Sequence, residues 1–256
     1  MKFHRNTLIG MGTVVAAFAL WYLLTVTTQL VSAARFPTPG DVWGALKQIT
    51  LQGYADAKLW RHVVQSTVLV LMGFVTAVSV GVVLGLVMGW SRRAEALLNP
   101  VFLLLRPIPP LAWIPLAIVW LGLGNGAKVL VIFMAAFVPA VINTYTGVRA
   151  MEPQIIEAAA MLGARGWRFV REVLVPAALP HIFTGLRLSL QASWTTLVAA
   201  ELVGALYGLG QVLNNAAQDI YPGMILVGMI FVGLCGGLMT GALAWIERRA
   251  MPWRSA

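Results

Sequence analysis

Charged residues are scarce in this chain, and their scarcity excludes an ordinary soluble domain. Only 11% of its 256 residues are charged, whereas a typical soluble domain carries about 25%. Hydrophobic residues make up 59% of the chain, and the mean hydropathy is +0.82. No soluble core of this size could bury so many apolar side chains, so the composition indicates an integral membrane protein.

Residues that would support catalysis, metal binding or disulfide formation are also few. The one cysteine, Cys235, excludes an intrachain disulfide and lies in a glycine-rich apolar run, as is typical of a packing residue. The three histidines, at positions 4, 62 and 181, are far apart in the sequence, and no Gly-x-Ser-x-Gly nucleophile motif occurs. Residues 122–128 are rich in glycine, but they lack the Gly-Lys-Ser/Thr ending of a phosphate-binding loop. We therefore expect no catalytic site, no metal site and no ATP hydrolysis by this chain.

Six apolar stretches are long enough to cross a membrane as helices, which requires about 20 residues each. They are residues 8–30, 63–90, 101–121, 129–148, 182–206 and 224–246. The first follows two cations and resembles a secretory signal, but its apolar run is too long for one, so we expect an uncleaved span. The sequence thus predicts an all-α, polytopic membrane protein with a single transmembrane domain over residues 1–256.

The cations are distributed unevenly between the two sides that these spans define. Eleven Lys and Arg residues fall on the side of both termini and five on the other, with Arg106 and Arg187 too close to the spans to be counted. The positive-inside rule then places both termini, and the loop after the fourth span, in the cytoplasm. Because this topology explains the net charge of +9, we expect no nucleic-acid partner.

Glycine and proline mark three further features of the chain. Residues 37–40 (PTPG) make a rigid turn, and a short amphipathic helix at the membrane interface is expected after it. Glycines spaced four residues apart form small-residue ridges at positions 81, 85 and 89 and at positions 233, 237 and 241. Either ridge could pack against a second copy, but packing within the chain is the simpler interpretation.

Prolines interrupt the third span between residues 107 and 115, and interrupted helices often line a transport pathway.

A polar, arginine-bearing segment, residues 152–176, separates the fourth and fifth apolar stretches. Pro153 suits the first turn of a helix that Gly163 can end in the left-handed conformation. A second helix is expected over residues 167–174, stopped by Pro176. Two short helices joined at a glycine would form a compact elbow that docks on a cytoplasmic partner and passes its movement into the fifth span. A merely solvated loop would need neither the run of alanines at 158–160 nor the glycine.

The spacing within this elbow also carries a family resemblance. Its motif residues are Glu157, Ala158, Ala159, Gly163, Val173, Val175 and Pro176. The pattern resembles the signature of the permease subunits of ABC importers that work with a binding protein, with valines replacing the usual isoleucine and leucine. The segments 36–39 (FPTP), 105–115 (LRPIPPLAWIP), 176–180 (PAALP) and 197–202 (LVAAEL) resemble the nitrate/sulfonate/taurine branch of that family, and 54–60 (YADAKLW) resembles its taurine members.

This resemblance implies a fold of the MetI-like type, with six transmembrane helices and a cytoplasmic coupling-helix elbow. It implies a homodimer in the bacterial inner membrane, two ATPase subunits that hold ATP and Mg, and a periplasmic or lipid-anchored substrate-binding protein. The chain itself would bind no cofactor. The residues implied to contact the ATPase are Glu157, Ala158, Ala159, Gly163, Ala164 and Pro176.

Polar and aromatic residues in or beside the spans are candidate pathway residues. Arg106 is expected about one and a half turns into the third span, where it could attract an anionic solute or extend to lipid headgroups. Glu201 could gate the pathway, receive the binding protein or form an interfacial salt bridge. The other candidates are Pro110, Trp113, Gln191 and Trp194.

Taurine or another sulfonate is the first choice of solute, and nitrate, bicarbonate, an aromatic carboxylate or a vitamin precursor remain open. A secondary carrier is a remote alternative, because Glu201 is the only acidic residue well within the predicted spans and no internal repeat is evident. An intramembrane enzyme would need paired catalytic groups, which the sequence lacks.

Overall fold

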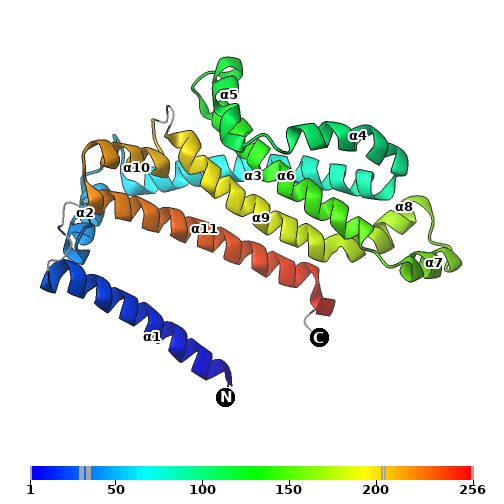
Figure 1. Ribbon diagram of the computed structural model, residues 1–256, viewed down its shortest axis with the longest axis horizontal. Helices are drawn as coiled ribbons and strands as arrows, with labels where there is room; N and C mark the ends of the chain where they lie inside the picture. The colour runs from blue at the N-terminus through cyan, green and yellow to red at the C-terminus, as the bar shows by residue number, and fades with distance from the viewer. Residues whose placement is uncertain (1, 29–31, 33–35, 203, 205, 255–256) are drawn as a thin grey trace. The chain divides into compact units, whose positions relative to one another are not determined.

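The computed structural model describes residues 2–28, 32, 36–202, 204 and 206–254, and helices joined by short loops make up the fold of these residues (Figure 1). The longer helices are α1 (Lys2–Tyr22), α2 (Pro39–Leu51), α3 (Leu59–Trp90), α4 (Arg92–Leu105), α5 (Ile114–Leu121), α6 (Asn125–Arg149), α7 (Pro153–Met161), α9 (Val175–Glu201), α10 (Leu209–Gln218) and α11 (Pro222–Ala250). The short elements are α8 (Gly166–Phe169), the 3-10 helices η2 (Pro110–Trp113) and η4 (Pro252–Arg254), and the π-helical η1 (Leu23–Thr27) and η3 (Val170–Leu174).

The chain forms two compact units. One contains residues 1–63 and 206–232, and the other contains residues 64–205 and 233–256. The long helices α3 and α11 each contribute residues to both units. The predicted coupling residues and pathway residues all lie in the second unit.

The helices have the lengths that a membrane protein requires. Five helical segments of the described chain are long and apolar enough to cross a membrane, and a bent pair of helices raises the number to six if it counts as one span. The prediction of an all-α, polytopic membrane protein is confirmed.

The bent pair replaces the predicted third span. Residues 101–121 are not one continuous helix, because α4 already begins at Arg92 and the chain turns by 86° before η2 and α5. Three prolines between residues 107 and 110 explain the break, since a proline lacks the N–H that continues a helix and its ring collides with the preceding turn. Phe102 of α4 and Ala117 of α5 are buried and anchor the two arms in separate apolar clusters.

The glycine ridge of α3 packs within the chain. A Cβ atom built on Gly81, Gly85 or Gly89 would lie only 2.6–2.8 Å from side-chain atoms of α6, so these positions need glycine for the two helices to approach so closely. Glycines 233, 237 and 241 of α11 meet no atom of the described chain within 4 Å. The first ridge therefore packs within the chain. The second ridge is available for contact with lipid or with another helix.

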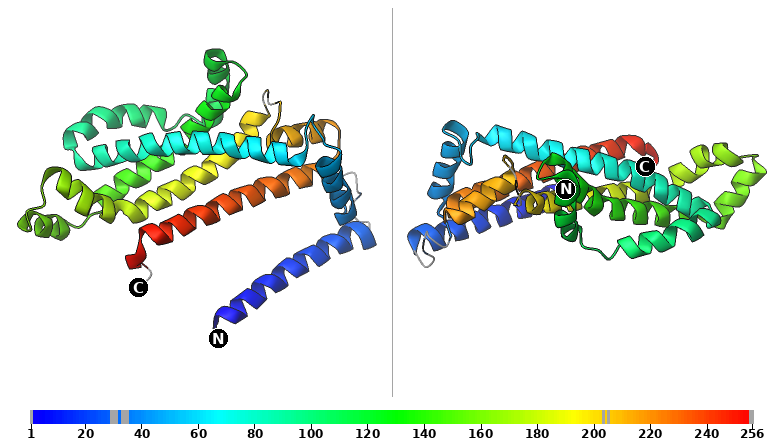
Figure 2. Two further views of the ribbon diagram at one scale, coloured as in Figure 1. Left: turned by 180° about the vertical axis from the view of Figure 1, so that it is seen from behind. Right: turned by 90° about the horizontal axis from the view of Figure 1, so that it is seen from above.

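Helix α9 lies alongside α6 over most of its length (Figure 2). Two glycines allow this approach: a Cβ on Gly147 would lie 2.5 Å from His181, and one on Gly185 would lie 2.8 Å from Asn143. The Ser189 hydroxyl donates to the Ala136 carbonyl across the contact, at 2.6 Å. The pair forms the rigid centre of the second unit.

Polar contacts organise the first unit. A reciprocal capping box between Thr38 and Asp41 starts α2, which agrees with the short helix expected there. The hydroxyl of Tyr54 donates to Asp219 at 2.5 Å, and burial together with this bond raises the pKa of Tyr54 above its ordinary value. The buried His62 ring contacts the Tyr54 carbonyl and accepts from the Gly208 N–H, so it serves as a structural residue.

Candidate functional site

The candidate site is the elbow between α6 and α9. Its first helix, α7, ends at Met161, and Gly163 follows with a φ of +78°. The Gly163 N–H donates to the Ala160 carbonyl at 3.1 Å, and the Ala164 N–H donates to the Ala159 carbonyl at 2.9 Å. These two bonds form a Schellman motif, which satisfies the last carbonyls of the helix and favours glycine at the left-handed position.

The second half of the elbow differs from the prediction. Pro176 does not stop a helix: α8, η3 and α9 follow one another without a gap, as one helical segment from Gly166 to Glu201. The π-helical η3 just before Pro176 explains this, because its wider turn moves the preceding carbonyl away from the proline ring. The elbow therefore joins the fifth span rigidly.

An apolar cluster fixes the base of the elbow. Val148 of α6 packs with Val170, Leu174, Ala178 and Ile182, all of which are buried. These residues belong to α6, to η3 and to α9, so the cluster ties the elbow to the helix pair at the centre of the unit. Movement of the elbow is thereby linked to movement of α9.

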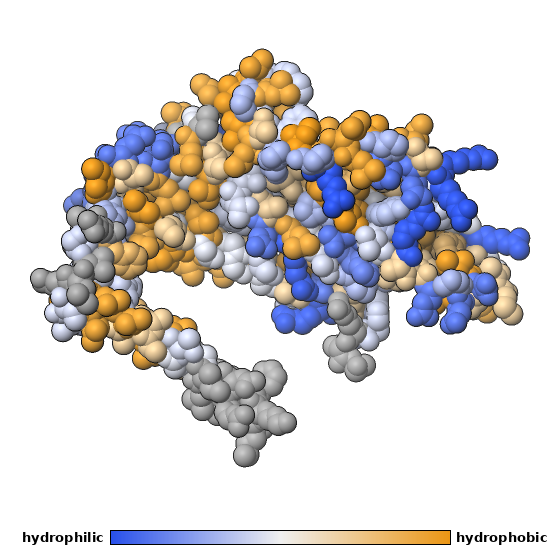
Figure 3. Space-filling view, in the orientation of Figure 1, coloured by the Kyte–Doolittle hydropathy of each residue, from blue (hydrophilic) through white to orange (hydrophobic). Residues whose placement is uncertain are grey.

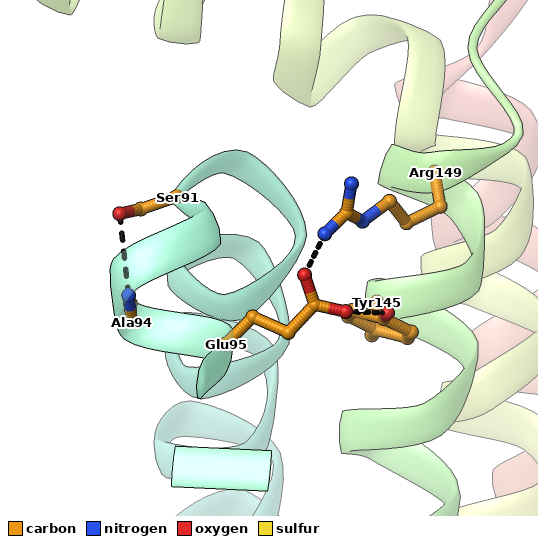
Figure 4. Close-up of polar contacts among 5 residues, drawn as sticks. All are labelled: Ser91, Ala94, Glu95, Tyr145 and Arg149. Atoms are coloured by element: carbon orange, nitrogen blue, oxygen red, sulfur yellow. Dashed lines mark hydrogen bonds and ion pairs between the residues drawn. The ribbon is translucent and has the colours of Figure 1, made fainter. Parts of the chain in front are cut away.

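A polar cluster adds a second anchor just before the elbow (Figure 4). Glu95 of α4 accepts hydrogen bonds from both Arg149, the last residue of α6, and Tyr145, one turn earlier. Ser91 caps α4 by accepting from the Ala94 N–H at 3.3 Å, which sets the position of Glu95. Sequence analysis missed this cluster, because its members are about 50 residues apart and only the fold brings them together.

The elbow exposes large apolar side chains. Met161 at the end of α7, Leu162 directly after it and Trp167 in α8 are 89, 84 and 74% exposed, in a segment that the sequence predicts to lie outside the membrane. Hydrophilic side chains gather around this end of the second unit, whereas apolar ones cover α5 (Figure 3). Large exposed apolar residues with a polar surround are typical of a protein-protein contact.

The predicted coupling residues do not all face outward. Glu157, Ala158 and Gly163 are exposed, and Ala164 and Pro176 are partly buried. Ala159 is buried, so only part of the alanine run could contact a partner.

Three candidate pathway residues lie at the break between α4 and α5. Arg106 is exposed and caps the C-terminal end of α4, where a cation interacts favourably with the helix dipole. Pro110 and Trp113 form the two ends of η2 and are partly buried. Arg106 is thus part of the bend, and not of a straight third span.

The other three candidates lie on α9, on different faces. Gln191 is exposed, whereas Trp194 is buried. Glu201 has no exposed surface, and it accepts a hydrogen bond from Ser66 of α3 at 2.8 Å. It points into the chain and not toward a docking surface.

The sequence did not predict the position of Lys128. It is one of the five cations assigned to loops on the side opposite the termini, but it lies in α6 with only 6% of its surface exposed. The carboxylate of Glu201 offsets the burial of its charge. Together with Ser66, the two residues form a buried polar cluster that joins α3, α6 and α9.

Comparisons with known proteins show the family to which the chain is similar. Residues 77–252 match the family described as "Binding-protein-dependent transport system inner membrane component". The chain is 35% identical to the taurine transport system permease protein TauC of Escherichia coli strain K12, over 97% of this chain and 90% of that protein. It is 34% identical to a putative aliphatic sulfonates transport permease protein, SsuC, of Bacillus subtilis strain 168 (93% and 84%). It is 36% identical to the bicarbonate transport system permease protein CmpB of Synechococcus elongatus (77% and 71%).

Proposed function

The chain belongs to the family of inner membrane components of binding-protein-dependent transport systems, and from this membership we propose that it forms half of a homodimeric pathway for taurine or another sulfonate. As a permease subunit of an ABC importer it has no catalytic role of its own. The energy would come from ATP and Mg on a separate ATPase subunit, and the solute would arrive on a binding protein. Both termini and the elbow would lie in the cytoplasm.

Two similarities support a sulfonate as the solute. The relatives named for taurine and for aliphatic sulfonates each cover more than nine-tenths of this chain, whereas the relative named for bicarbonate covers 77%. The segment 54–60, which resembles the taurine members, forms a loop from Tyr54 to Lys58 and then enters α3 at Leu59, and Tyr54 is bonded to Asp219. Nitrate, bicarbonate, aromatic carboxylates and vitamin precursors are the alternative solutes.

The exposed apolar side chains of the elbow are the main observation in support of the proposal that the elbow binds the ATPase subunit. We expect that replacing Met161 and Leu162 together by serine lowers the amount of ATPase that co-purifies with the permease by about tenfold or more, because apolar contacts at an interface centre contribute strongly to affinity. The measurement is the ratio of the two subunits after affinity purification from co-expressing cells.

The matched control is Leu123→Ser. Leu123 is 61% exposed in the turn before α6, at the opposite end of that helix from the elbow. This variant should retain the ATPase. Equal retention by both variants would mean that the elbow is not the docking surface.

Arg106 provides a separate test of the pathway. We expect Arg106→Ala to lower uptake of an anionic solute severalfold while leaving ATPase binding unchanged, because a cation beside a broken span attracts anions. Uptake is measured with radiolabelled taurine in proteoliposomes. Unchanged uptake would assign Arg106 to the lipid headgroups instead.

A further inference from the structure

An ion pair joins the middle of the fifth span to the end of the last helix. Arg187 lies near the midpoint of α9, and its guanidinium donates to the carboxylate of Glu247 in the last turn of α11. A charged residue inside a membrane span is costly and is a candidate functional residue for that reason. Since helix side chains lean toward the N-terminal end of their helix, the pair lies on the Val175 side of the midpoint, the inner half in the proposed topology.

The two partners of this pair are not equally accessible. The side chain of Glu247 is only 9% exposed, whereas that of Arg187 is 47% exposed. A guanidinium has five N–H donors, and the contact with Glu247 leaves several of them toward the exposed side. The carboxylate is therefore fixed in the protein, and the cation is the partner that a small molecule can reach.

Arg187 stands within a polar stripe on one face of α9. Thr184, Gln191 and Thr195 are exposed on the same face, at helical spacing from Arg187. The opposite face is covered by α6. The two threonine hydroxyls donate to carbonyls of their own helix, so they do not require water.

The side chain of Gln191 indicates whether this polar stripe contacts lipid or water. Its side-chain amide makes no hydrogen bond to the part of the chain that the structure describes. In contact with lipid, this amide and the free donors of Arg187 would be unsatisfied, which is strongly unfavourable. The stripe therefore faces water or a solute, as a surface lining a pathway does.

We propose that Arg187 binds the acidic group of the solute, a sulfonate, in the inner half of the pathway, and that Glu247 is the counter-charge that holds Arg187 when no solute is bound. The planar guanidinium suits an oxyanion with several oxygens. Because Glu247 stays beside Arg187 when the solute is bound, its negative charge weakens the attraction of Arg187 for a second anion. This weaker binding favours release into the cytoplasm. This assignment rests on the proposed function.

The test is ATP-dependent uptake of radiolabelled taurine by proteoliposomes that contain the permease with its ATPase and binding protein. We expect Arg187→Gln to lower uptake by about tenfold or more, through the loss of a charge-assisted hydrogen bond. The control Arg93→Gln removes the same charge from an exposed position in the first turn of α4, and it should transport normally. Glu247→Gln should lower both KM and kcat, because a guanidinium without its counter-charge holds the anion longer.

A double variant distinguishes solute binding by Arg187 from a purely structural role of the ion pair. Arg187→Gln combined with Glu247→Gln removes both charges of the ion pair, so it should fold and bind the ATPase but still fail to transport. Recovery of uptake in this double variant, or normal uptake by Arg187→Gln alone, would show a structural ion pair only and overturn the assignment. Absence of ATP-dependent uptake by the unsubstituted transporter would contradict the proposed function itself.

Discussion

We expect the Gly163→Asp variant to insert into the membrane at a normal level. Its ATP-driven uptake should be lower by about tenfold or more, because the substitution introduces backbone strain and a negative charge into the elbow. Gly163 has a φ of +78°, a conformation that disfavours most residues with a side chain. A carboxylate at this position also lies at the C-terminal end of α7, the negative end of the helix dipole.

Space is not the reason for this expected loss. A Cβ at position 163 would meet no atom within 4 Å in the described chain, so the substitution leaves the permease fold intact. Gly163→Asn is the matched control, because asparagine has nearly the same size, adopts the left-handed conformation readily and carries no charge. It should retain much more uptake than Gly163→Asp. Normal uptake by Gly163→Asp would contradict the role of the elbow in coupling.

We expect Lys128→Met to lower the apparent melting temperature of the detergent-purified protein by about 10 °C, since removing a buried cation that interacts electrostatically with a buried carboxylate costs about 3–5 kcal/mol. Lys128 and Glu201 are both buried, and with Ser66 they join α3, α6 and α9. Without Lys128, the carboxylate of Glu201 would lose a favourable electrostatic interaction. The measurement is a thermal-unfolding curve followed by intrinsic fluorescence.

Two further variants test the interaction between Lys128 and Glu201. Combining Lys128→Met with Glu201→Gln should recover most of the lost stability, because the buried negative charge is removed together with the cation. Lys47→Met, on an exposed position of α2, should change the melting temperature little. A melting temperature for Lys128→Met equal to that of the unsubstituted protein would mean that Lys128 reaches water.

The sequence predicted those features that depend on neighbouring residues. The long apolar runs predicted the membrane class, and the proline-rich segment predicted an interruption between α4 and α5. The end of α7 at a left-handed Gly163 followed from a local cap, which needs only a few adjacent residues. The resemblance to ABC importer permeases, carried by the spacing in the elbow, is confirmed by the family match.

Features that depend on distant residues could not be predicted in this way. Pro176 would normally end a helix, but packing of Val170 and Leu174 in the apolar cluster accompanies the π-helical turn that accommodates it. Lys128 looked like a loop cation because Ser66 and Glu201 are far from it in the sequence. Arg187 looked like a residue at the edge of a span for the same reason: its partner, Glu247, is 60 positions away.

The unbroken path from Gly166 to Glu201 makes the fifth span a lever. Its 36 residues measure about 54 Å at the rise of an α-helix, and α6 supports it along the middle. If a push at the elbow end tilts this helix about that support, its two ends move in opposite directions. One stroke would then widen the mouth of the pore on one side of the bilayer while narrowing it on the other, with no separate gate at either end.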